Sequence, residues 1–170
     1  YASNNLFHLT GANSSLVIGA NSYNNESLYV GEYGHHNKML VDDGASAQIT
    51  EKAYVGRYPT ANSNQLAVCS GGEMTFGLNL YVGQSTGDTN GGNRLSLSNG
   101  WVYCTNGASD TIYVRSGSIV EVRGTNSLLD TSMLVVSNSS TFSFTIDNPW
   151  NQPPIRVRNA ADFSDNTTIL

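Results

Sequence analysis

Leu28-Tyr29-Val30-Gly31 is a four-residue stretch that returns along the chain at nearly regular intervals. Its copies are Ala53-Tyr54-Val55-Gly56, Leu80-Tyr81-Val82-Gly83, Ile112-Tyr113-Val114-Arg115 and, more loosely, Leu134-Val135-Val136-Ser137. The valines at positions 30, 55, 82, 114 and 135 are separated by 21 to 32 residues. A period in this range is typical of repeat proteins, in which one structural unit stacks on its copies.

A second phrase, of the form Asn-x-Leu-x-Val-x-x-Gly, follows each of the first three copies after a polar loop. Its leading apolar residues are Met39, Leu66, Leu95, Val120 and Phe142. Each of them is followed two positions later by another apolar residue, and this alternation predicts a strand with one buried face. Turns are expected at Gly44, Gly71, Gly100 and Gly124, and a further short strand follows each turn. The inward residues of these further strands are Ala47/Ile49, Met74/Phe76 and either Val102/Cys104 or Tyr103/Thr105.

Three short strands in about 25 residues cannot bury their apolar sides alone, whereas stacked copies share one continuous core. We therefore predict an all-β parallel β-solenoid that forms a single domain over residues 1–170, with about five to six coils and no helix. Residues 28–146 are expected to form regular coils. Residues 1–27 are expected to form an irregular first coil, in which Leu16-Val17-Ile18-Gly19 echoes the Val-Gly phrase, and residues 147–170 an atypical last coil. The ends of the chain suggest a fragment of a larger protein.

Composition excludes several classes of function. Only 12% of the residues are charged, the net charge is −5, and the eight Lys and Arg residues form no cluster, so no nucleic-acid partner is expected. No apolar run approaches the roughly 18 residues of a membrane-spanning helix, so direct membrane insertion is not expected. Two cysteines, Cys69 and Cys104, favour free thiols over a disulfide framework, although a single bridge remains open.

The repeated phrases resemble the passenger repeats of autotransporter-type surface proteins, and the long secreted β-helix proteins of gut and aquatic bacteria that have no known enzymatic activity. The closing segments Phe142-Ser143-Phe144-Thr145-Ile146 and Pro154-Ile155-Arg156-Val157 add to this resemblance. It covers most of residues 28–157, and its motifs specify fold rather than activity. The resemblance implies a right-handed single-stranded parallel β-helix that is exported and displayed outside the cell or on a bacterial surface.

Four tyrosines are the candidate ligand-binding residues. Tyr29, Tyr54, Tyr81 and Tyr113 occupy the same outward position in successive copies, so we expect them to stack into an external aromatic ladder. Such a ladder could offer a surface for sugar rings, or it could only stabilise neighbouring coils. The second interpretation is favoured. Asn37, Asn64 and Asn93 precede equivalent strands, and they are expected to form a hydrogen-bonded ladder along the stack.

The remaining polar motifs favour structural interpretations. Adjacent His35 and His36 lack the second pair of ligands that a metal site needs, and we interpret His8 as occupying an inward position at the open end of the core. Asp42-Asp43 is similar to the paired carboxylates of β-helix polysaccharide hydrolases, but Cys69-Ser70 and Ser98-Asn99 stand at the equivalent positions, so a turn is favoured. No catalytic residue, metal or cofactor is predicted.

The sequence therefore predicts a non-catalytic exported or cell-surface segment that serves structural display or adhesion, with a glycan or a host surface as its partner. Loops 32–38, 57–65 and 84–94 would lie in a row and form a binding strip. The alternative is a polysaccharide lyase or glycoside hydrolase on the same scaffold, which requires several carboxylates in one cleft. No pattern specifies the oligomeric state.

Overall fold

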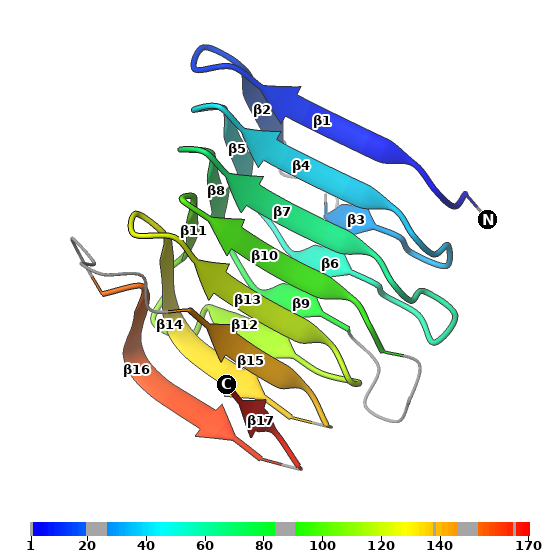
Figure 1. Ribbon diagram of the computed structural model, residues 1–170, viewed down its shortest axis with the longest axis vertical. Coiled ribbons are helices and arrows are strands. Elements are labelled where there is room, and N and C mark those ends of the chain that lie inside the picture. Colours follow the sequence, from blue (N-terminus) through cyan, green and yellow to red (C-terminus); the bar gives the residue numbers. More distant parts are fainter. Residues whose placement is uncertain (1, 20–26, 84–90, 138, 146–152, 165) are drawn as a thin grey trace.

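The computed structural model describes residues 2–19, 27–83, 91–137, 139–145, 153–164 and 166–170. It shows an all-β parallel solenoid of about five turns, with seventeen strands in these ranges. Figure 1 shows how the strands stack. Every strand pair is parallel, and the described part of the chain contains no helix. Accordingly, no helix in this part could cross a membrane. The fold class predicted from the sequence is confirmed.

The strands stack on three faces of the solenoid, which we number in chain order. Face one contains β1 (Leu6–Thr10), β4 (Lys38–Asp42), β7 (Gln65–Cys69), β10 (Arg94–Ser98), β13 (Ile119–Arg123), β15 (Thr141–Phe144) and β17 (Thr168–Ile169). Face two contains β2 (Ser15–Ile18), β5 (Ser46–Ile49), β8 (Glu73–Phe76) and β11 (Trp101–Cys104). Face three contains β3 (Leu28–Val30), β6 (Ala53–Val55), β9 (Leu80–Val82) and β12 (Thr111–Val114).

Two longer strands, β14 (Leu128–Val136) and β16 (Ile155–Phe163), each continue from face two to face three. Because β14 pairs with β11 through its first half and with β12 through its second half, the two faces join into one ten-stranded sheet. In Figure 1 the chain crosses the near side in β4, turns back through β5, and returns behind in β6 to enter β7 one level lower. This path is a right-handed coil.

The register confirms the period read from the sequence. The leading residues of the second phrase are aligned, so that Met39, Leu66 and Leu95 are successive partners on face one. Because side chains alternate along a strand, these three residues and the apolar residues two positions after each of them point into the core. All six are 0–2% exposed. Val102 and Cys104, rather than Tyr103 and Thr105, are the inward residues of β11.

The register confirms Leu134-Val135-Val136-Ser137 as a copy of the first phrase, with Leu134 on Ile112 and Val136 on Val114. Two details of the prediction are wrong. Val135 does not belong to the series of inward valines, because outward and inward positions alternate from Leu134 onward and Val135 pairs with Tyr113. The segment Leu16-Val17-Ile18 belongs to face two, where β2 pairs with β5, and not to the face that carries the Leu-x-Val phrase. Strand β1 lies in regular register on β4, so the first coil already follows the pattern on two faces.

An asparagine ladder fixes the turns between face three and face one, as predicted. The side-chain amide of Asn37 donates to Oδ1 of Asn64 at 3.0 Å, and that of Asn64 donates to Oδ1 of Asn93 at 3.1 Å. Each of these oxygens also accepts the backbone N–H of the asparagine one coil earlier. Asn5 extends the ladder upward by the same bonds to Asn37. From Asn37 to Asn93 the result is a buried row whose polar groups are paired along the solenoid axis.

The ladder also explains why glycine ends the Tyr-Val-Gly phrase. Gly31 and Gly56 have φ angles of 77° and 76°, a conformation that L-residues with a Cβ rarely adopt. A Cβ at Gly31 would overlap the amide of Asn64, and a Cβ at Gly56 would overlap that of Asn93. The two sequence phrases are therefore coupled, because the glycine of one turn makes room for the asparagine of the next.

Candidate ligand-binding edge

The four predicted tyrosines form a continuous stack on face three. Tyr29, Tyr54, Tyr81 and Tyr113 are register partners from β3 to β12. Successive ring centroids are 5.2, 5.0 and 4.9 Å apart, and each pair of ring planes is inclined by 7°. The strand spacing of a parallel sheet brings identical side chains to this distance, which allows face-to-face contact. The predicted aromatic ladder is confirmed as a structural feature.

A second aromatic stack lies in the neighbouring turns. Tyr33 and Tyr58 are 4.1 Å apart between ring centroids and inclined by 11°. Their turns pair in the same way as the strands do, since the backbone N–H of Tyr58 donates to the carbonyl of Glu32 and that of Arg57 to the carbonyl of Gly31. This stack was not predicted, although Val30-Gly31-Glu32-Tyr33 and Val55-Gly56-Arg57-Tyr58 place both tyrosines at the same position after the Val-Gly phrase.

Arg57 connects the two stacks. Its guanidinium carbon lies 4.9 Å from the ring centroid of Tyr29, 5.4 Å from that of Tyr54 and 4.9 Å from that of Tyr58. Its Nη1 also contacts Oε1 of Glu32 at 2.6 Å. Partial burial opposes the charge of Arg57, but the hydrogen bond to Glu32 and the nearby tyrosines raise the pKa of the guanidinium overall. We call Tyr29, Glu32, Tyr33, Arg57 and Tyr58 the aromatic edge.

The ladder presents ring edges rather than ring faces along most of its length, because the faces are used by neighbouring tyrosines. Tyr54 is only 7% exposed. This burial is the largest cause of the raised pKa of its hydroxyl, and the neighbouring Tyr81 and Tyr29 raise it further. Tyr29 and Tyr33 are 38% and 39% exposed. The accessible aromatic surface is therefore concentrated at the N-terminal end of the two stacks, beside Glu32 and Arg57.

A cavity of about 600 Å³ opens next to this part of the aromatic edge. Its apolar wall is the end of the solenoid core, and its polar rim includes Asn5, Glu32, Asn37 and Lys38. The apolar residues that line it are Leu6, Phe7, Leu16, Ile18, Leu28, Val30 and Met39. A volume of this size, with an apolar wall and a few polar groups, is typical of sites that hold a small ligand.

The other predicted polar motifs do not converge on this edge. His8 faces outward and not inward, so that prediction is wrong. Its Nε2 lies 2.9 Å from Oδ1 of Asp42. This hydrogen bond is the main cause of the lowered pKa of Asp42, and a smaller contribution comes from a hydrogen bond with Thr10. Asp43 lies in the predicted turn before Gly44 with a φ of 52°.

His35 and His36 contact each other in an exposed turn, with 2.7 Å between their Nδ1 atoms. Within the described residues, no group of three or more His, Cys, Asp and Glu side chains is arranged to hold a metal ion. Loop 84–94, the third part of the predicted strip, falls partly outside the described residues, since positions 84–90 are not among them.

Both cysteines are free thiols, as favoured by the sequence. Cys104 is completely buried, its Sγ donates to the carbonyl of Leu78 at 3.0 Å, and burial raises the pKa of the thiol to about 12. Burial also raises the pKa of Cys69. Neither environment produces the low thiol pKa that a nucleophilic cysteine needs.

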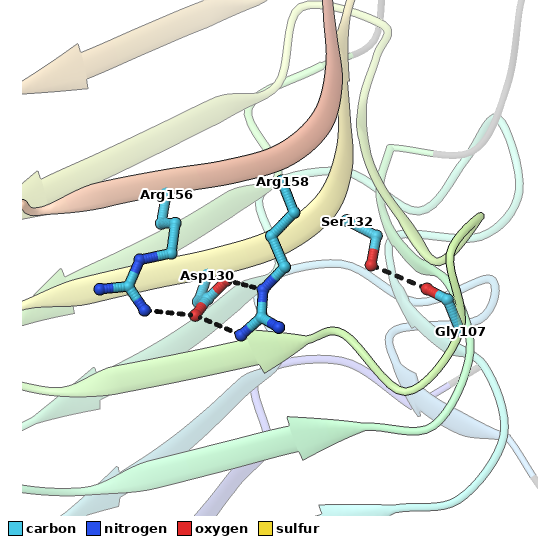
Figure 2. A network of polar contacts seen from close by, with 5 residues as sticks. All are labelled: Gly107, Asp130, Ser132, Arg156 and Arg158. Carbon is cyan, nitrogen blue, oxygen red and sulfur yellow. Dashed lines mark hydrogen bonds and ion pairs between the residues drawn. The ribbon is translucent and has the colours of Figure 1, made fainter.

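A buried carboxylate that sequence reasoning missed lies on face two, where β14 pairs with β11 (Figure 2). The Asp130 side chain on β14 is 1% exposed, and it lies between the guanidinium groups of Arg156 and Arg158 on β16. Arg158 contacts it through Nε and Nη2, both at 2.9 Å, and Arg156 through Nη1 at 3.3 Å. The arrangement attaches the last coil to the rest of the solenoid.

Replacing Asp130 by alanine is expected to lower the melting temperature by about 4–8 °C, because three charge-assisted hydrogen bonds are lost while both arginines regain water. Amide hydrogen exchange should accelerate first in β16. Asp162, which is exposed on the same strand, provides the control, and its alanine variant should melt within about 2 °C of the wild type. Equal shifts for the two variants would show that Asp130 does not hold the last coil.

Comparisons of this chain with models of protein families, with curated proteins and with solved structures find no match.

Proposed function

We propose that this chain is a non-catalytic segment of an exported or cell-surface β-solenoid protein of the autotransporter-passenger type. Its role is structural display or adhesion, and a glycan is the ligand of the aromatic edge. The observation that carries this proposal is the convergence of two tyrosine stacks on one arginine and one carboxylate at the turns between face three and face one.

The chemistry of the aromatic edge suits a carbohydrate. Tyrosine rings bind the apolar faces of sugars while their hydroxyl groups reach water or a polar partner. Arg57 and Glu32, each partly exposed, supply hydrogen-bond donors and acceptors for sugar hydroxyls within reach of the same rings. The stacked coils hold these side chains in place before a ligand arrives, which lowers the entropic cost of binding.

The alternative function, a polysaccharide lyase or hydrolase, requires carboxylates close to one another in one cleft. The carboxylates that form ion pairs in the described part of the chain lie instead on different coils. Each of them contacts a basic residue of its own. Glu32 contacts Arg57, Asp42 contacts His8, Glu121 contacts Arg94 and Arg123, and Asp130 contacts Arg156 and Arg158. No observation among these residues favours the enzyme.

A glycan-array screen followed by calorimetric titration tests the proposal. We expect a glycan whose affinity falls at least tenfold, which corresponds to about 1.4 kcal/mol, when Tyr33 is replaced by alanine. Tyr103→Ala on face two is the matched control and should leave the affinity unchanged. Far-ultraviolet circular dichroism and the melting temperature should show that both variants fold. A screen without any hit, or equal losses in the two variants, would refute glycan binding at the aromatic edge.

A further inference from the structure

Face two carries an aromatic pair on the shaft of the solenoid, away from both end coils. Trp101 and Tyr103 project outward from β11, because the residues that alternate with them, Val102 and Cys104, are completely buried. Both aromatic residues are partly exposed, and their Cα atoms are roughly 6.6 Å apart along the strand. Strand β11 pairs with β8 on one side and with β14 on the other, so neighbouring coils flank the pair (Figure 1).

A carboxylate lies beside this aromatic pair. Glu73 on β8 is the register partner of Trp101, so the two Cα atoms are about 4.8 Å apart and both side chains point outward. Glu73 also acts on Tyr103. Partial burial is the largest cause of the raised pKa of the Tyr103 hydroxyl, and the nearby charge of Glu73 is the next. An indole, a phenol and a carboxylate are therefore neighbours on one exposed sheet face.

The charge of Glu73 is not balanced by a basic residue in the described part of the chain. Glu73 is the only charged residue of β5, β8 and β11, and it forms no ion pair with a described residue. Arg156, on the other side of Tyr103, is already in contact with Asp130 (Figure 2). The carboxylate is thus free to interact with a cation from outside, and the net charge of −5 attracts such a cation.

We propose that Glu73, Trp101 and Tyr103 form a binding site for a trimethylammonium group. The face of an aromatic ring attracts a cation, most strongly when the ring is an indole. The methyl groups of the ligand pack on the rings, while its charge is balanced by the carboxylate beside them. Within the described residues, neither Trp101 nor Tyr103 stacks on another aromatic ring, so their faces are available.

A neutral sugar is the other ligand that an aromatic pair on a sheet face can bind. The cation is favoured because Glu73 offers only hydrogen-bond acceptors, and because its full charge gains most from a ligand of opposite charge. The site goes beyond the proposed glycan binding, since it lies on face two, whereas the aromatic edge lies at the turns between face three and face one. Either site can therefore fail its test without affecting the other.

Calorimetric titration of the whole chain with choline and with its neutral tert-butyl analogue tests the site. The two molecules have the same shape, so a difference in affinity reports the charge. We expect choline to bind at least tenfold more tightly than the analogue. Phosphatidylcholine vesicles, added in parallel, distinguish a lipid headgroup from free choline as the source of the group.

Two variants assign the binding to these residues. Glu73→Gln keeps the shape of the side chain and removes its charge, so the affinity for choline should fall about tenfold. Trp101→Leu keeps an apolar cover over its register partner Leu128 but removes the ring, and should abolish binding. Glu51→Gln removes the same charge from the turn after β5 and is the control, with unchanged affinity. Circular dichroism and the melting temperature check that all three variants fold.

Equal affinity for choline and its neutral analogue would overturn the proposal. So would binding of choline that Trp101→Leu leaves intact, or an equal loss in Glu73→Gln and Glu51→Gln. If choline did not bind and a neutral sugar bound in a manner that Trp101→Leu abolishes, the aromatic pair would be a glycan site and the cation site would be refuted.

Discussion

Replacing Asn64 by alanine is expected to lower the free energy of unfolding by about 3–5 kcal/mol, a large part of the total stability of a domain this size. The Asn64 side chain is completely buried and makes four hydrogen bonds. It accepts from the backbone and side-chain N–H groups of Asn37, and it donates to the carbonyl of Gly34 and to Oδ1 of Asn93. Alanine leaves the backbone N–H of Asn37 and the carbonyl of Gly34 buried without these partners.

Urea-induced unfolding monitored by circular dichroism measures this effect. Asn106→Ala is the matched control, because Asn106 is exposed and makes one hydrogen bond of 3.3 Å to the carbonyl of Gly77. Its loss should cost no more than about 0.5 kcal/mol. If Asn64→Ala cost as little as the control, the asparagine row would be a consequence of the fold and not a source of its stability.

The asparagine and tyrosine rows were predictable because period and position suffice to define them. A side chain that recurs at the same place in each strand must lie above its copy once the strands stack in parallel, whatever the loops between them do. The length of the loops varies, but the register of Tyr29, Tyr54 and Tyr81 does not depend on it. The position of a residue within the repeat therefore predicts both ladders, and the structure of the turns need not be known.

The aromatic edge and the Asp130 cluster were missed, because most of their residues lie outside the repeated phrases or differ in type from one coil to the next. Arg57 reaches Tyr29 and Glu32 only because two turns of different sequence pair their backbones. Asp130 is the register partner of Arg156, 26 residues later, so the repeat period did hold the signal. It was hidden because β14 runs through a corner where the other coils break into two strands.

The error at His8 has a related cause. The alternation of Phe7 and Leu9 already places His8 on the outer side, opposite Leu40. Interpreting His8 as an inward residue gave more weight to the apolar character of its neighbours than to the two-residue period. The exposed fraction of Phe7, 49%, shows that an inward position in an end coil need not be buried.

Replacing Gly56 by alanine is expected to cost about 2–4 kcal/mol, and the effect tests the coupling between the two repeated phrases. One part of the cost is the positive φ of 76°, which alanine tolerates poorly. The other part is steric, because the new Cβ would overlap the amide of Asn93 and displace it from its hydrogen bonds to Asn64 and to the carbonyl of Ala61.

Gly71→Ala separates the two parts. Gly71 has a similar φ of 80°, but a Cβ there would meet only the backbone of Gly44, at 3.8 Å. Its variant should therefore carry the conformational cost alone, about 1 kcal/mol in urea unfolding. In an Asn93→Ala background the additional cost at Gly56 should disappear, since no amide remains to be displaced. If Gly56→Ala and Gly71→Ala were equally destabilising, the glycine would be needed for its φ angle alone, and the link between Tyr-Val-Gly and the following asparagine would have another origin.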